Sequence, residues 1–138
     1  MIQGQPAFER KQNCLVDQRI AKKCILLVDS DEAYCQILGM LLENEGYSVT
    51  TCRDTLRAIS LIATKPFDFV ISEHSNIGVN GVQVLETAKQ LNSDIPVLLM
   101  AALYEMETYI EAMHRGALDY ISKPIDYAEM KRLVCTHS

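Results

Sequence analysis

The chain has 138 residues, of which 49% are hydrophobic and 22% are charged, and its formal net charge is −5 at pH 7. These values are typical of one soluble globular domain with a core of its own. The negative net charge argues against nucleic-acid binding by this chain alone. No apolar run is long enough to span a bilayer, and the polar start of the sequence does not resemble a signal peptide. The five cysteines have no CxxC or Cys/His ligand spacing, which predicts reduced, mostly buried thiols in a cytoplasmic protein.

Charge is unevenly distributed along the chain. Residues 1–23 hold five basic and two acidic residues, a net charge of +3, so the remaining residues carry −8. We expect residues 1–22 to form a loosely ordered N-terminal extension and residues 23–138 to form the folded domain. A frayed helix is the alternative for the extension, because its apolar residues are loosely spaced.

From Cys24 onward, apolar runs alternate with helical patterns. Strands are expected at 24–28, 47–51, 67–72, 97–100 and 118–122. Apolar residues at helical spacing predict a helix after each strand. The first helix should end at Gly46, and the second should begin after the cap Asp54 and end before Pro66. The third should run from about Gly81 to Leu91. The fourth is marked by an apolar stripe and the fifth begins after the cap Asp126; the stripe residues are Met106, Tyr109, Ile110 and Met113.

Five successive strand–helix units predict an α/β fold with a parallel sheet covered by helices on both faces. In such folds the working site lies at the carboxyl ends of the strands. Asp29, Ser30 and Asp31 follow the first strand, Glu73 ends the third, and Lys123 follows the fifth. Acids that converge on a hard cation, with a lysine nearby to hold an anion, suit phosphoryl chemistry.

Four stretches resemble the receiver domain of two-component response regulators. "ILLVDSDE" is similar to the first-strand acidic motif of that family and "DFVISEHSNIGVNG" to the segment that bears its phosphoacceptor. "IPVLLMAA" is similar to its fourth strand and switch position, and "RGALDYISKPID" to its fifth strand and Lys-Pro turn. The resemblance implies a doubly wound, flavodoxin-like three-layer α/β/α fold with sheet order 2-1-3-4-5. It also implies a module of signal transduction and phosphorelay that is not an enzyme.

Carried over residue by residue, part of the family's site is present. The resemblance implies that Asp29 is the first metal-binding acid, Lys123 the site lysine and Tyr120 the aromatic switch residue. Asp31 lies where the first helix should begin, so it is expected to cap that helix. The resemblance thus implies no cofactor, with Mg²⁺ held weakly by Asp29 or not at all.

Three positions depart from the family pattern. Ser30 stands where a second acid is usual, Glu73 stands at the aspartate that accepts phosphate, and Ala101 stands at the Ser or Thr whose hydroxyl contacts the phosphoryl group. Glu reaches about 1.5 Å further than Asp, and in-line attack on phosphorus needs tighter placement than that. Together the departures predict a degenerate receiver, of the pseudo-receiver type, whose phosphorylation chemistry is lost or severely weakened.

Simpler interpretations of the same residues stay open at this point. Asp29 is alternatively a helix cap, Lys123 a surface lysine, and Glu73 a solvated acid at a strand end. His74 beside Glu73 is more readily a loop histidine than a metal ligand. Tyr120 is alternatively a plain core aromatic.

We therefore favour an atypical receiver domain that acts as a protein-interaction module, largely independent of aspartyl phosphorylation. The alternatives are a conventional phosphoacceptor receiver with a non-standard site and a receiver fragment of a larger transcriptional regulator. A flavin-binding protein of similar fold is disfavoured, because the acidic "DSDEAY" after the first strand would repel a phosphate. The expected partner is a protein, a histidine kinase or an output domain, with neither nucleic acid nor membrane.

Two finer predictions concern contacts. The resemblance favours binding, including a homodimer, through the fourth helix, fifth strand and fifth helix. The residues of that face would be Met106, Tyr109, Tyr120, Met130 or their exposed neighbours, with Glu105, Glu107 and Glu111 as an acidic rim. At the site, we predict an ion pair between Glu73 and Lys123, or a close approach of the two through one water. The rival is that Glu73 turns to solvent and Lys123 pairs with Asp29.

Overall fold

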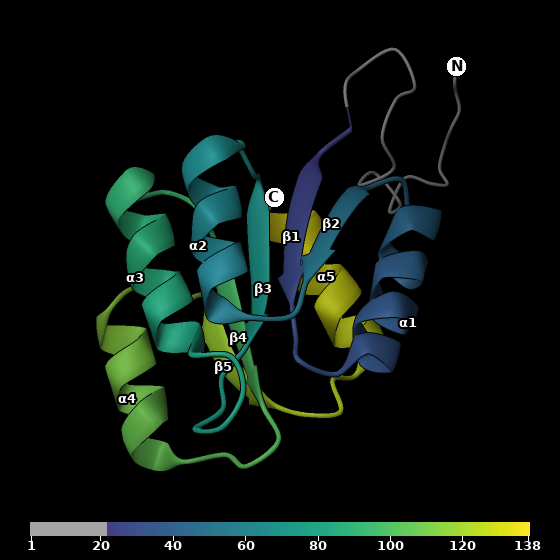
Figure 1. The fold of residues 1–138 in the computed structure, drawn as a ribbon. Helices are drawn as coiled ribbons and strands as arrows, with labels where there is room; N and C mark the ends of the chain where they lie inside the picture. Colours follow the sequence, from purple (N-terminus) through teal and green to yellow (C-terminus); the bar gives the residue numbers. More distant parts are fainter. Residues whose placement is uncertain (1–21) are drawn as a thin grey trace.

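A computed structural model of the chain describes residues 22–138 (Figure 1). The predictions for the N-terminal extension concern residues that lie almost wholly outside this part. The elements in chain order are β1 (Cys24–Val28), α1 (Glu32–Asn44), β2 (Ser48–Cys52), α2 (Thr55–Thr64), β3 (Phe69–Glu73), α3 (Gly81–Leu91), β4 (Val97–Ala101), α4 (Met106–His114), β5 (Asp119–Ser122) and α5 (Tyr127–His137). Every predicted strand and helix is present, with strand boundaries shifted by two residues or fewer.

The five strands form one parallel sheet in the order β2-β1-β3-β4-β5, as predicted. Helices α1 and α5 cover one face, and α2, α3 and α4 cover the other (Figure 1). Two hydrophobic clusters lie between the helices and the sheet. Every residue of β3 and of β4 is buried, which explains why these strands read as nearly continuous apolar runs.

Short-range signals set the helix ends. Asp31 caps α1 by accepting a hydrogen bond from the backbone N–H of Tyr34. Asp54 and Asp126 cap α2 and α5 in the same manner. Each of these caps satisfies an N–H that has no partner inside the helix. Gly46 lies beyond α1 with φ of 100°, a backbone conformation that glycine adopts without strain.

The predicted partner face needs correction. Tyr120 of β5 and Met130 of α5 are 2% and 0% exposed, so neither side chain is available to a partner. The apolar stripe of α4 divides: Tyr109 packs against the core, whereas Met106 and Ile110 are exposed. The exposed apolar part of the predicted face therefore belongs to α4.

The cysteines follow the sequence prediction only in part. Cys24, Cys35 and Cys52 are free thiols, and the last two are buried. Cys135 of α5 is disulfide-bonded, so the prediction of a reduced thiol is wrong for this residue. Across residues 22–138, the helices are too short or too polar to cross a membrane.

Candidate functional site

The carboxyl ends of β1, β3 and β5 bring two acids and a lysine together. Val28 pairs with Ser72 in the sheet, so Asp29 and Glu73 follow at the same edge. Lys123 Nζ lies 2.8 Å from Asp29 Oδ2 and 3.8 Å from Glu73 Oε2. The convergence predicted from the strand ends is thus present in the structure, and we call Asp29, Ser30, Glu73 and Lys123 the acid–lysine cluster.

Asp29 has no exposed surface and is fully engaged. Its Oδ1 accepts a hydrogen bond from the Asp31 backbone N–H at 2.9 Å, and its Oδ2 accepts one from Lys123. Burial raises the pKa of Asp29, and the hydrogen bond from Lys123 offsets part of this rise. The cap interpretation therefore does not apply to Asp29, because Asp31 caps α1.

Lys123 is held in the cleft as a cation. Burial lowers the pKa of Lys123, but the hydrogen bond and charge of Asp29 and the charge of Glu73 outweigh burial, so the pKa is raised. The ammonium lies 4.5 Å from the centre of the Tyr34 ring. The Tyr34 hydroxyl in turn accepts a hydrogen bond from the Ile125 backbone N–H. Nothing in the sequence pattern marks this contact between Tyr34 and Lys123.

Glu73 points into the cluster and is 7% exposed. Its Oε1 accepts hydrogen bonds from the Ser30 backbone N–H at 2.9 Å and from Ser30 Oγ at 2.8 Å. An aspartate at position 30 would carry no proton to donate at neutral pH. The serine that replaces an acid therefore binds the glutamate that replaces the aspartate.

The loop between β3 and α3 passes directly over the Glu73 carboxylate. A Cβ built on Gly78 would lie 3.0 Å from Ser30 Oγ and 3.3 Å from Glu73 Oε1. The sequence does not indicate this close approach, because a glycine in a loop carries no signal of what it faces. The close backbone approach helps to explain why Glu73 is buried.

The predicted Glu73–Lys123 contact is present at ion-pair distance. The shorter contact of Lys123 is nevertheless its hydrogen bond to Asp29, which the rival prediction named. The other half of that rival, with Glu73 turned to solvent, is wrong. Lys123 therefore interacts with both acids, with Asp29 by a hydrogen bond and with Glu73 across a longer gap.

The other predicted site residues lie apart from the cluster. The Asp31 carboxylate caps α1, so it is turned toward the helix. Ala101 ends β4 and is 1% exposed, with no hydroxyl to offer. The ring of Tyr120 is buried with its centre 5.0 Å from that of Tyr104. The switch role of Tyr120 stays a prediction.

The residues present fit a Mg²⁺ ion poorly. Mg²⁺ prefers octahedral oxygen ligands, usually with one or two carboxylates. Both oxygens of Asp29 and one of Glu73 already accept hydrogen bonds. Within residues 22–138, no group of three His, Cys, Asp or Glu side chains is placed to hold a metal. His74 is engaged elsewhere, because its Nδ1 accepts a hydrogen bond from the Val82 N–H in the first turn of α3.

Fold and site together define the class of protein. The pattern of the response regulator receiver domain matches residues 25–134. The chain belongs to this family, so it is a receiver domain of two-component signalling.

Particular relatives make the comparison more specific. The chain is 38% identical to the transcriptional regulatory protein ZraR of Escherichia coli (strain K12) over 119 residues, which cover 83% of this chain and 27% of that protein. It is 31% identical to the DNA-binding transcriptional regulator NtrC of Klebsiella pneumoniae over 108 residues, 78% of this chain and 23% of that protein. The chain thus spans about a quarter of the length of these relatives.

A solved CheY-like receiver domain protein from Methanospirillum hungatei JF-1 has the same fold. It superposes with a TM-score of 0.78 over 83% of this chain and 91% of that chain, at 24% identity. At this identity the likeness supports the fold alone.

Proposed function

We propose that this receiver domain signals through protein–protein contacts without aspartyl phosphorylation, with the acid–lysine cluster holding its site in one state. The observation that carries the proposal is the position of Glu73. Its carboxylate stands where the family's phosphoacceptor stands, yet it is hydrogen-bonded to Ser30 and faces Lys123. In this arrangement the ammonium meets two carboxylates and no phosphoryl group is needed to engage it.

Each requirement of phosphoryl transfer is weakened here. The transfer depends on positioning and on electrostatic stabilisation of the charge on the phosphoryl oxygens. Glu73 Oε1 already accepts two hydrogen bonds, so phosphoryl transfer to this oxygen would require the Ser30 contacts to break. Ala101 offers no hydroxyl to a phosphoryl oxygen, and the site lacks the second acid that would help to hold Mg²⁺.

The chain is also proposed to be the receiver part of a longer regulator. This second proposal is supported by the two curated relatives, which are about four times longer than the matched region. Its partner would then be an output domain or a histidine kinase, in the cytoplasm. A homodimer through α4, β5 and α5 stays a prediction.

The test is incubation with acetyl phosphate and Mg²⁺, read by intact mass. We expect no stable phosphoryl adduct on the unmodified chain and no heat of Mg²⁺ binding by calorimetry. Glu73→Asp alone should restore little, because Ser30 still leaves the cation short of a ligand. The triple variant Ser30→Asp, Glu73→Asp, Ala101→Thr serves as the positive control. A stoichiometric, hydroxylamine-labile adduct on the unmodified chain would show that the proposal is wrong.

A further inference from the structure

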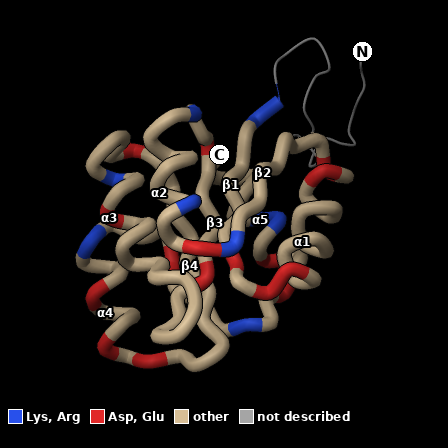
Figure 2. Tube along the Cα trace, viewed as in Figure 1, with Lys and Arg blue, Asp and Glu red and all other residues tan. Residues whose placement is uncertain are grey.

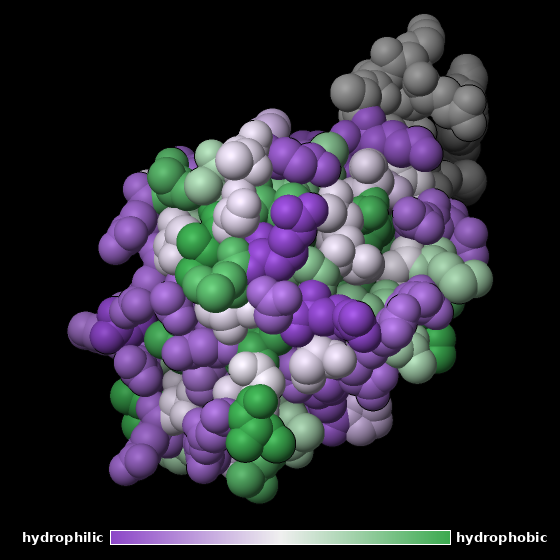
Figure 3. Space-filling model, in the orientation of Figure 1, coloured by the Kyte–Doolittle hydropathy of each residue, from purple (hydrophilic) through white to green (hydrophobic). Residues whose placement is uncertain are grey.

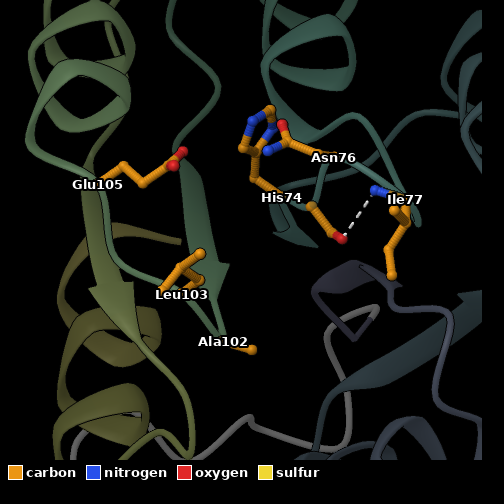
Figure 4. Close-up of a pocket in the computed structure, with 7 residues that line it drawn as sticks. His74, Asn76, Ile77, Ala102, Leu103 and Glu105 are labelled. Carbon is orange, nitrogen blue, oxygen red and sulfur yellow. Dashed lines mark hydrogen bonds between the residues drawn. The ribbon is translucent and has the colours of Figure 1, made fainter.

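A groove of about 340 Å³ lies beside the acid–lysine cluster, between the β3–α3 loop and the β4–α4 loop. Ile77 and Leu103 line it from the two loops, and Glu105 and His74 project toward it from opposite sides (Figure 4). A hydrogen bond from the Ile77 backbone N–H to Ser75 Oγ fixes the turn of the first loop. The groove therefore has a defined shape, and the proposed function assigns no role to it.

Exposed apolar side chains line this groove and continue along the chain into α4. Of the nine large apolar residues that are exposed in the described part, Ile77 and Leu103 line the groove, and three more follow Leu103 in the β4–α4 loop and in α4. We call these five the loop–α4 surface: Ile77, Leu103, Tyr104, Met106 and Ile110. Ile77 is 98% exposed and Leu103 is 73% exposed. Apolar side chains are visible at the lower end of the molecule, where the two loops lie (Figure 3). A cluster of this kind marks an interaction site, whereas single exposed apolar residues do not.

The charge around the loop–α4 surface has one sign. Residues 90–114 contain no Lys or Arg, and the charged residues in the loop before α4 and in its first turns are all acidic (Figure 2). Glu111 pairs with Arg115, but Glu105 and Glu107 form no ion pair with any residue in 22–138. Within the described part of the chain, the groove is thus lined by one acid without an ion-pair partner, Glu105, and a second such acid, Glu107, follows in the first turn of α4.

We propose that the loop–α4 surface binds an amphipathic segment of a protein partner that presents apolar side chains flanked by Lys and Arg. Apolar side chains of the segment fill the groove between Ile77 and Leu103, and its basic side chains meet Glu105 and Glu107. This inference rests on the proposed function only in assuming a protein partner. It moves the binding face from β5 and α5 to the loops and to α4, since Tyr120 and Met130 are buried.

The test uses the full chain and a fluorescein-labelled synthetic peptide with Leu along one helical face and Lys elsewhere, read by fluorescence anisotropy. The double variant Ile77→Ser, Leu103→Ser should weaken binding by about tenfold or more. Leu56→Ser is the matched control, because Leu56 is 78% exposed on α2 and does not line the groove. Circular dichroism should show that both variants stay folded.

The charge part of the inference has its own control. Glu105→Gln with Glu107→Gln should weaken binding several-fold at low salt and flatten its salt dependence. Glu32→Gln with Glu43→Gln removes the same charge from α1 and should change little. A peptide with Glu in place of Lys should not bind.

The inference is overturned if the Leu/Lys peptide does not bind the full chain. The same absence of binding is expected if the chain's own residues 1–21 occupied the groove. It is equally overturned if Leu56→Ser weakens binding as much as the groove variants do. The proposed function fails by a different readout, the phosphoryl adduct, so the two failures are distinguishable.

Discussion

Replacing Lys123 by Met removes the only cation of the acid–lysine cluster and leaves two buried carboxylates facing each other. Asp29 is 0% exposed and Glu73 is 7% exposed, so bulk solvent screens their repulsion only weakly. Loss of one partner from a buried ion pair costs about 3–5 kcal/mol, against a typical total stability of about 5–15 kcal/mol for a domain. We therefore expect Lys123→Met to lower the free energy of unfolding by about 3 kcal/mol or more at pH 7.

The pH dependence has a definite sign. Without Lys123, Asp29 loses the hydrogen bond that offsets burial, so its already raised pKa rises further. The cost of the substitution should then shrink as pH falls through that raised pKa, because a protonated Asp29 no longer repels Glu73. In the unmodified chain the raised pKa of Lys123 contributes stability below its ordinary value of 10.5, and this contribution is lost as pH rises through the folded-state pKa.

The assay is urea unfolding followed by far-ultraviolet circular dichroism between acidic and neutral pH. Lys131→Met is the matched control: Lys131 Nζ lies 3.3 Å from Glu45 Oε2, but the lysine side chain is 45% exposed, so its loss should cost at most about 1 kcal/mol. Adding Asp29→Asn to Lys123→Met should recover more than half of the loss. The reasoning is refuted if Lys123→Met costs no more than Lys131→Met, or if its cost does not depend on pH.

Two further outcomes are expected. Burial raises the pKa of Cys35 and Cys52 to about 11, so each holds roughly a hundredfold less thiolate at mildly alkaline pH than an ordinary thiol. Iodoacetamide should therefore label Cys24 first among these three cysteines, as followed by peptide mapping over time. Equal labelling of all three at early times would contradict this. Gly81→Ala should destabilise the chain by about 1–3 kcal/mol in urea unfolding, because its Cβ would clash with the backbone carbonyl at the end of β3. Gly39→Ala, whose Cβ would lie 3.6 Å from its nearest neighbour inside a helix, should be neutral or stabilising.

The fold could be predicted because its signals are local and repeated. Buried strands read as apolar runs, and caps such as Asp54 and Asp126 mark where helices begin. The convergence of Asp29, Glu73 and Lys123 follows from the same signals, since parallel strands place their carboxyl ends at one edge of the sheet. The order of the strands was not contained in these patterns and came from the family resemblance.

The contacts within the site could not be predicted, because they depend on side-chain directions over distances of a few ångströms. The sequence indicated that Lys123 would meet an acid, but not that it would bond Asp29 and lie further from Glu73. The division of the α4 stripe into exposed Met106 and core-packed Tyr109 could not be predicted for a related reason. Helix α4 has only 9 residues and apolar side chains on more than one side, so its periodicity does not tell which side is buried.

Ser30 and Glu73 were counted from the sequence as separate losses, yet in the structure they act on each other. The longer reach of Glu, about 1.5 Å beyond Asp, is used to contact the Ser30 N–H and hydroxyl. With serine at position 30, the cluster holds Asp29, Glu73 and one lysine, a net charge of −1 when all three are ionised. With the family's usual acid there, it would hold −2, and like charges at this distance require a cation or a proton. The serine therefore relieves the need for Mg²⁺ at the same position where it removes a Mg²⁺ ligand, which supports a site that keeps its shape without either metal or phosphate.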